Sequence, residues 1–234
     1  MKPSLYLFVP LIALLGLSAC FEEPDYDLVP ALVSFDDFYF VDPPGATDTL
    51  VIRVNFQDGD GDLGLTAREG SFFDPFTIIR DINGDPIKYD PTNPDLPPFN
   101  CTDYLSPTGN NPIIIGNDTI TDTILVEPNP LVRNFEVTLF RRVSDGVYEA
   151  IDFGDPSICR APLGGRFSPL KDDFSNKKPL EGTIQFSAPS LIFKPLFRND
   201  SLKIGVVIRD RAGNESNLLE SDPFTLSDIT RFSD

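Results

Sequence analysis

The chain of 234 residues contains no histidine and no tryptophan, and it has only three cysteines. Histidine is the commonest general base of enzymes and the commonest side-chain ligand of zinc, so its absence removes both roles. Catalytic arrangements of the Ser-His-Asp or Cys-His kind are therefore excluded for this sequence.

Basic residues are also scarce. The chain has 19 lysines and arginines against 36 aspartates and glutamates, which gives a formal net charge of −17 at pH 7. Binding to nucleic acid or to anionic lipid needs clustered positive charge, so this composition disfavours both partners and favours cation binding. Hydrophobic residues make up 41% of the chain, which is enough for a core in one large domain or two small ones.

Long hydrophobic runs are absent except near the N-terminus. Lys2 precedes an apolar stretch from Leu5 to Leu17 that ends in small residues, as secretory signal peptides do. The stretch is too short to serve as a stable membrane span. The residues Leu17-Ser18-Ala19-Cys20 resemble the lipobox of bacterial lipoproteins, which are cut before a cysteine that carries a lipid. We therefore predict a signal peptide over residues 1–19 and lipidation of Cys20; an ordinary signal peptide is the alternative.

The segment after Cys20 is acidic. It reads Phe21-Glu22-Glu23-Pro24-Asp25, which resembles the surface-export tag of Bacteroidota-type lipoproteins. We assign residues 20–30 to a lipidated cysteine and an acidic linker, and we predict a membrane partner through the N-terminal lipid. The expected location is the cell-surface side of the outer membrane, with the periplasmic face as the alternative.

The other two cysteines form an even pair. If Cys20 carries the lipid, Cys101 and Cys159 remain together in an oxidising compartment. We predict a Cys101–Cys159 disulfide, which in the chain-entropy model contributes roughly 4 kcal/mol for a loop of that size. Two buried free thiols are the alternative.

Apolar residues alternate with polar ones at a period of two in several places, and no run beyond the N-terminal segment has helical spacing. The clearest alternation runs from Leu50 to Phe56. Similar patterns predict strands around Phe135–Leu139, Ile184–Phe186 and Leu202–Ile208, and hairpin turns at Gly116-Asn117 and Asp145-Gly146. The chain should therefore be mostly β.

Antiparallel strands with one apolar face predict an all-β protein with an immunoglobulin-like antiparallel β-sandwich. We place this sandwich over residues 31–234. Two stretches rich in proline and glycine cannot join the interior of a sheet, so we expect long irregular insertions around residues 57–112 and 153–180.

The most informative motif follows the strand that ends at Phe56. Its residues are Asp58-Gly59-Asp60-Gly61-Asp62-Leu63-Gly64. Three carboxylates at alternate positions, with glycines that let the chain curl, can direct oxygen ligands at one calcium ion. Glu69 falls at the twelfth position, where an EF-hand supplies its last ligand, but Leu63 replaces the glycine that an EF-hand loop needs. A solvated acidic turn is the alternative.

A second motif, Asp210-Arg211-Ala212-Gly213-Asn214-Glu215-Ser216, follows the strand that ends at Arg209. If the two preceding strands are the second and sixth of an immunoglobulin-like fold, their loops lie at the same end of the sandwich. Asp210 and Asn214 would then complete a calcium site begun by the aspartates of the first motif.

Together, the lipobox, the acidic tag and these two motifs resemble a family of Bacteroidota-type outer-membrane and surface lipoproteins with an immunoglobulin-like sandwich and a DGDGDLG loop. The resemblance covers both ends of the chain and leaves the middle uncovered. It implies no catalytic activity.

Three functions are consistent with these features. The first is a non-enzymatic, lipid-anchored binding module whose calcium-ordered loops present a surface for a glycan or an envelope protein. The second is a structural accessory subunit of an envelope complex. The third is a hydrolase that uses paired carboxylates such as Asp58 and Glu69. The first is the prediction, and we expect no enzymatic activity.

Overall fold

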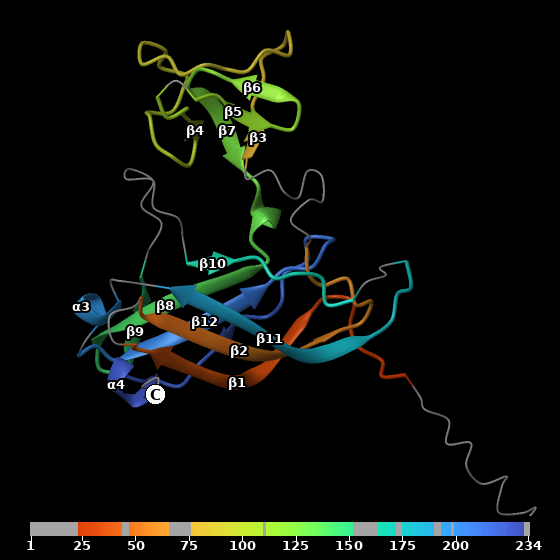
Figure 1. Ribbon diagram of the computed structural model, residues 1–234, viewed down its shortest axis with the longest axis vertical. Helices are drawn as coiled ribbons and strands as arrows, with labels where there is room; N and C mark the ends of the chain where they lie inside the picture. Colours follow the sequence, from red (N-terminus) through yellow and green to blue (C-terminus); the bar gives the residue numbers. More distant parts are fainter. Residues whose placement is uncertain are drawn as a thin grey trace, which may run out of the picture.

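The computed structural model describes residues 23–43, 47–65, 76–109, 111–151, 163–171, 175–189, 193–197 and 199–231. Strands dominate these residues (Figure 1). The helices are short: η1 (Pro130–Val132), α3 (Phe193–Phe197) and α4 (Leu226–Ile229). None of the helices in the described ranges is long and apolar enough to cross a membrane. The predicted all-β fold class is confirmed.

The first sheet of the sandwich has four strands in the order β11-β2-β1-β14. Their bounds are β1 (Ala31–Val41), β2 (Thr49–Asp58), β11 (Leu180–Pro189) and β14 (Thr230–Arg231). The central strand β2 pairs antiparallel with β1 on one side and with β11 on the other, whereas β14 runs parallel to the end of β1.

The second sheet has the order β10-β8-β12-β13, and β9 also pairs with β8. Its strands are β8 (Phe135–Ser144), β9 (Val147–Ala150), β10 (Gly164–Gly165), β12 (Leu202–Ile208) and β13 (Leu219–Glu220). The predicted turn at Asp145-Gly146 joins β8 to β9, and Gly146 has the positive φ of 72° that a tight hairpin turn needs.

The strand order is that of an immunoglobulin-like sandwich. β1, β2 and β11 take the places of strands A, B and E, while β8, β12 and β13 take those of C, F and G. The strands that we placed second and sixth are therefore β2 and β12. Because both run toward the same end of the molecule, the loops that follow them meet there.

One apolar core lies between the two sheets. The predicted inward face of β2, which includes Ile52 and Val54, is fully buried against residues of β8 and β12. Phe135 of β8 stacks on Phe186 of β11 with ring centroids 4.9 Å apart, so the two sheets are in direct contact. Burying each large apolar side chain contributes about 1.5–3 kcal/mol, and this repeated burial fixes the register of the strands.

The segment between β2 and β8 forms a small module, residues 76–128, with its own strands. These are β3 (Phe76–Ile78), β4 (Tyr104–Leu105), β5 (Ile113–Ile115), β6 (Asp118–Ile120) and β7 (Ile124–Pro128). The predicted hairpin at Gly116-Asn117 joins β5 to β6. Figure 1 shows the module beside the sandwich, where η1 leads back into β8. The insertion therefore continues past residue 112, where we placed its end, because residues 113–128 pair within the module.

Candidate metal centre

The acidic motif begins at the last residue of β2 and lies where several segments meet. Leu180 at the start of β11 pairs with Asp58, and Leu63 forms a bridge with Asp210 in the loop after β12. We call this part of the molecule the loop end; it comprises residues 59–65, the described residues of 163–179, and residues 209–218. The expectation that the two motifs lie at the same end of the sandwich is confirmed.

The glycines of the motif let its aspartates turn toward one another. Gly61 has a φ of 63°, a conformation that residues with a side chain rarely adopt. Gly59 packs so closely that an added Cβ would lie 2.4 Å from the carbonyl oxygen of Tyr26. As a result, one carboxylate oxygen from each of Asp58, Asp60 and Asp62 lies within 4.8 Å of the others.

Asp58 and Asp60 are buried, Asp62 is half-buried, and all three carboxylates are short of hydrogen-bond donors. Asp58 is 0% exposed and Asp60 is 7% exposed. Among the described residues, no donor forms a hydrogen bond with either side-chain oxygen of Asp58, with Oδ1 of Asp60 or with Oδ1 of Asp62. An unpaired buried carboxylate is strongly unfavourable, so a positively charged partner or a bound proton would stabilise this arrangement.

Burial and mutual repulsion make the carboxyls harder to ionise. Burial is the main cause that raises the pKa of Asp58 to about 7, with further contributions from the charges of Asp60, Asp62 and Asp210. Burial, followed by the charge of Asp210, raises the pKa of Asp62 to about 6. Without a cation, the folded protein therefore holds part of this cluster in the protonated form near neutral pH.

Asp210 and Asn214 lie together beside the cluster. Asp210 is 1% exposed; its Oδ1 accepts a hydrogen bond of 2.7 Å from the backbone N–H of Asn214, and its Oδ2 accepts one of 2.7 Å from the Asn214 side-chain amide. The structure thus brings both residues to the loop end, where the charge of Asp210 acts on Asp58 and Asp62. Direct coordination of a metal by either residue stays a prediction.

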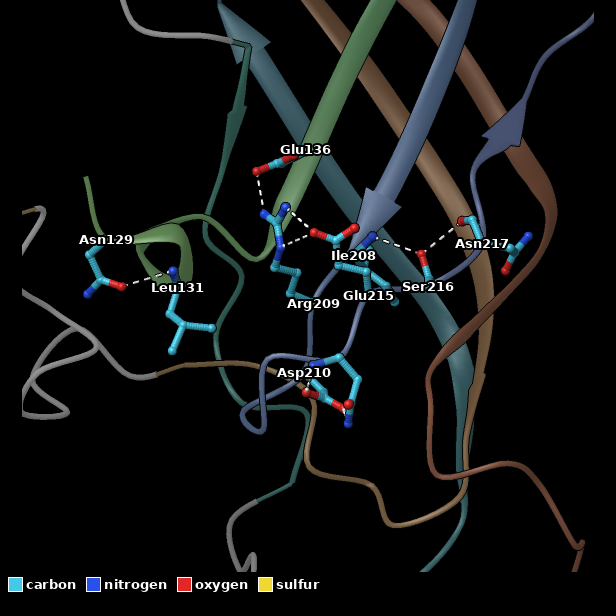
Figure 2. Close-up of polar contacts among 10 residues, drawn as sticks. Asn129, Leu131, Glu136, Ile208, Arg209, Asp210, Glu215, Ser216 and Asn217 are labelled. Carbon is cyan, nitrogen blue, oxygen red and sulfur yellow. Dashed lines mark hydrogen bonds and ion pairs between the residues drawn. The ribbon is translucent and has the colours of Figure 1, made fainter. Parts of the chain in front are cut away.

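The loop that carries Asp210 is held firmly at its base (Figure 2). The Arg209 guanidinium forms ion pairs with Glu136 of β8 and with Glu215. The Ser216 hydroxyl accepts a hydrogen bond of 3.0 Å from the N–H of Ile208 and donates one of 2.9 Å to the carbonyl oxygen of Asn217. These contacts fix the place of Asp210 relative to the end of β12.

Two lysines from the segment before β11 reach the acidic motif. The Lys177 ammonium lies 2.8 Å from Oδ2 of Asp60. The Lys171 ammonium donates hydrogen bonds to the backbone carbonyl oxygens of Asp60 and Asn176, at 2.8 and 3.0 Å. Neither lysine could be assigned to the site from the sequence, since both are more than a hundred positions from Asp60 and no spacing rule links them to it.

The linker segment also contacts the loop end. The N–H of Gly59 donates a hydrogen bond of 2.8 Å to the carbonyl oxygen of Asp27. Farther out, Glu23 and Lys178 form an ion pair at 3.3 Å. The acidic motif is therefore packed directly against the chain that follows the predicted lipid anchor.

Several predicted site residues lie outside the described part of the chain. Cys20, Glu69 and Cys159 belong to this group, so the lipidation site, the twelfth loop position and one half of the disulfide stay predictions. Cys101 is described, and it does not carry a free thiol. Its pairing with Cys159 also stays a prediction.

The chain matches no protein family, and no curated protein or solved structure is significantly similar to it.

Proposed function

We propose that Asp58, Asp60 and Asp62 bind a calcium ion that orders the loop end of a non-enzymatic binding protein, held in the outer membrane by a lipid on Cys20. The observation that supports the metal most strongly is the Asp58 carboxylate, which is fully buried and accepts no hydrogen bond from the described residues. A bound cation would offset the cost of burying this charge.

The choice of calcium follows from the ligand atoms. The three aspartates offer four unpaired carboxylate oxygens, and calcium takes about six to eight oxygen ligands, some of them backbone carbonyls or water. Zinc and copper favour nitrogen and sulfur ligands, which this cluster lacks. Magnesium usually keeps several of its own waters, whereas Asp58 is fully enclosed.

Thermal unfolding of the purified protein in EDTA and across a calcium titration tests this proposal. A ligand that binds only the folded state stabilises it by about 2.7 kcal/mol at a hundred times its Kd, so the melting temperature should rise clearly. Asp58→Asn should abolish the rise, because it removes one charge from the cluster. An unchanged melting temperature in the wild type would contradict the proposal.

Asp81→Asn is the matched control. Asp81 also stands in an Asp-Asn-Asp turn, but its Oδ1 accepts hydrogen bonds of 2.9 Å from the backbone N–H groups of Asn83 and Asp85. These bonds satisfy the carboxylate and lower its pKa, as expected for a simple turn. The calcium response of Asp81→Asn should therefore equal that of the wild type.

One observation in the small module favours a glycan as the ligand of this binding protein. Phe99 is 48% exposed, and it stacks on the buried Tyr104 with ring centroids 5.8 Å apart. The Tyr89 ring contacts both of these rings edge to face, with ring centroids 5.6 Å from Phe99 and 5.0 Å from Tyr104. A half-exposed ring that is fixed in place offers a flat surface on which a sugar ring can pack.

Binding of the protein to an array of bacterial and host glycans checks this candidate. We expect Phe99→Ala to lose any glycan that the wild type retains. Ile82→Ala, which removes a fully exposed apolar side chain from the same module, should retain it. Failure of the wild type to bind any glycan would favour the accessory subunit of an envelope complex instead.

A further inference from the structure

The Lys177 side chain is mostly in water except where its ammonium meets the acidic motif. Its exposed fraction is 69%, whereas that of its partner, the Asp60 side chain, is 9%. The ammonium lies 2.8 Å from Oδ2 of Asp60, while Oδ1 of the same carboxylate is buried and accepts no hydrogen bond from the described residues. One oxygen of this carboxylate lies within 4.8 Å of an oxygen of Asp58 and of Asp62. The positively charged Lys177 ammonium therefore already occupies one carboxylate oxygen at the edge of the proposed metal centre.

We propose that Lys177 is a built-in competitor for this centre: its ammonium neutralises Asp60 while no metal is bound, and it leaves Asp60 when a divalent cation binds. This inference rests on the proposed calcium function and adds to it a residue that sets the affinity. A calcium ion at the cluster repels the nearby ammonium, and bidentate coordination by Asp60 would need the oxygen that Lys177 occupies.

Release of the ammonium costs little, because the rest of the side chain is already solvated and the freed group regains water. Lys171 differs in this respect. Its ammonium donates to the backbone carbonyl oxygens of Asp60 and Asn176, and these two bonds hold the backbone of the loop. We therefore expect Lys171 to stay in place when the metal binds.

Calcium titration calorimetry of the full chain, comparing the wild type with Lys177→Met, tests the competitor. The Lys177 side of the pair is exposed, and such ion pairs are worth up to about 1 kcal/mol, so removing the charge should tighten calcium binding about two- to fivefold, with a smaller effect at high salt. Lys178→Met is the matched control. Lys178 is the neighbouring lysine, pairs with Glu23, and should leave the affinity unchanged.

Amine labelling of the wild-type protein gives a second test that needs no variant. We expect acetylation of Lys177, followed by peptide mass spectrometry, to proceed faster in calcium than in EDTA, while labelling of Lys171 stays slow in both. If the wild type binds calcium but Lys177→Met binds it no more tightly and Lys177 labelling is unchanged, the competitor is refuted and the calcium site stands. If the wild type binds no calcium, both proposals fail.

Discussion

Asp58 couples the stability of the metal-free protein to pH. Its pKa is about 7 in the folded protein, and that of Asp62 is about 6, against an ordinary value of 3.8 for both. A carboxyl with a raised pKa in the folded state favours folding while it is protonated. The contribution of these carboxyls to the free energy of unfolding is therefore complete below about pH 4 and is lost as the pH rises through 6 to 7.

We expect the wild-type protein in EDTA to be less stable at pH 8 than at pH 5, as urea unfolding would measure. Between these two pH values the shift of Asp58 alone accounts for roughly 3 kcal/mol of this loss. Asp58→Asn cannot ionise and should lose less stability over the same range. Equal pH dependence of the two proteins would show that Asp58 is not the group responsible.

Gly59 is the residue at which the acidic motif meets the linker segment. An added Cβ would lie 2.4 Å from the carbonyl oxygen of Tyr26 and 2.6 Å from that of Asp27. Backbone atoms cannot give way as a flexible side chain can, so we expect Gly59→Ala to destabilise the protein by about 1–3 kcal/mol in chemical unfolding. In Gly182→Ala, the new methyl group would meet the Phe56 ring at an ordinary 3.5 Å, and stability should change far less.

The acidic cluster could be predicted from the sequence because its three aspartates are close neighbours in the chain. Alternate positions and intervening glycines are local features, and the distance between their oxygens follows from them. Asp210 was placed correctly only through an assumed strand order. The contact of Lys177 with Asp60 depends on how the segment before β11 folds over the loop, and no local sequence pattern predicts such a contact.

At the scale of elements, strands were predicted correctly where apolar and polar residues alternate regularly, and a strand was missed where this alternation is interrupted. β2, β8 and β12 were found from their inward apolar residues. β1 was missed because irregularities in its pairing with β2, between Leu32 and Ser34 and between Phe35 and Asp37, interrupt the period of two. At the first irregularity, the Asn217 side chain donates to the carbonyl oxygen of Leu32 and accepts from its N–H.

Serine side chains complete the pairing of β12. The Ser216 hydroxyl accepts from the buried N–H of Ile208 at 3.0 Å, and the Ser221 hydroxyl accepts from that of Ile204 at 3.0 Å. Ser216→Ala would leave a buried N–H without a partner, which costs about 1–3 kcal/mol. We expect this loss in urea unfolding, whereas Ser187→Ala, at an exposed position of β11, should stay close to the wild type. Equal stability of the two variants would contradict this role.

At the scale of the whole molecule, the linker segment that follows the predicted lipid anchor lies at the same end as the acidic cluster. Glu23 is three positions after Cys20, and a chain of that length spans at most about 11 Å. If Cys20 carries a lipid, the ion pair of Glu23 with Lys178 and the adjacent acidic motif lie near the membrane surface. Calcium would then order the part of the sandwich that meets the tether, which leaves ligand binding to surfaces farther away, such as the small module.

The small module has little core of its own. Its cluster consists of Ile120, Ile124 and Val126, with a few partly buried neighbours, and it is separate from the core of the sandwich. Cores of this size rarely support a fold alone, so the module needs another constraint. Cys101 lies in the module without a free thiol, and a disulfide there would contribute about 2–4 kcal/mol.

We therefore expect a reducing agent to unfold the module before the sandwich. Hydrogen exchange followed by peptide mass spectrometry should show faster exchange across residues 76–128 after reduction, while the amides of β2, β8 and β12 stay protected. Cys101→Ser should reproduce this pattern without reductant, and Thr102→Ala, at the exposed neighbouring position, should not. Faster exchange throughout the sandwich on reduction would mean that the module and the sandwich unfold as one unit, because only a shared cooperative transition opens both cores together.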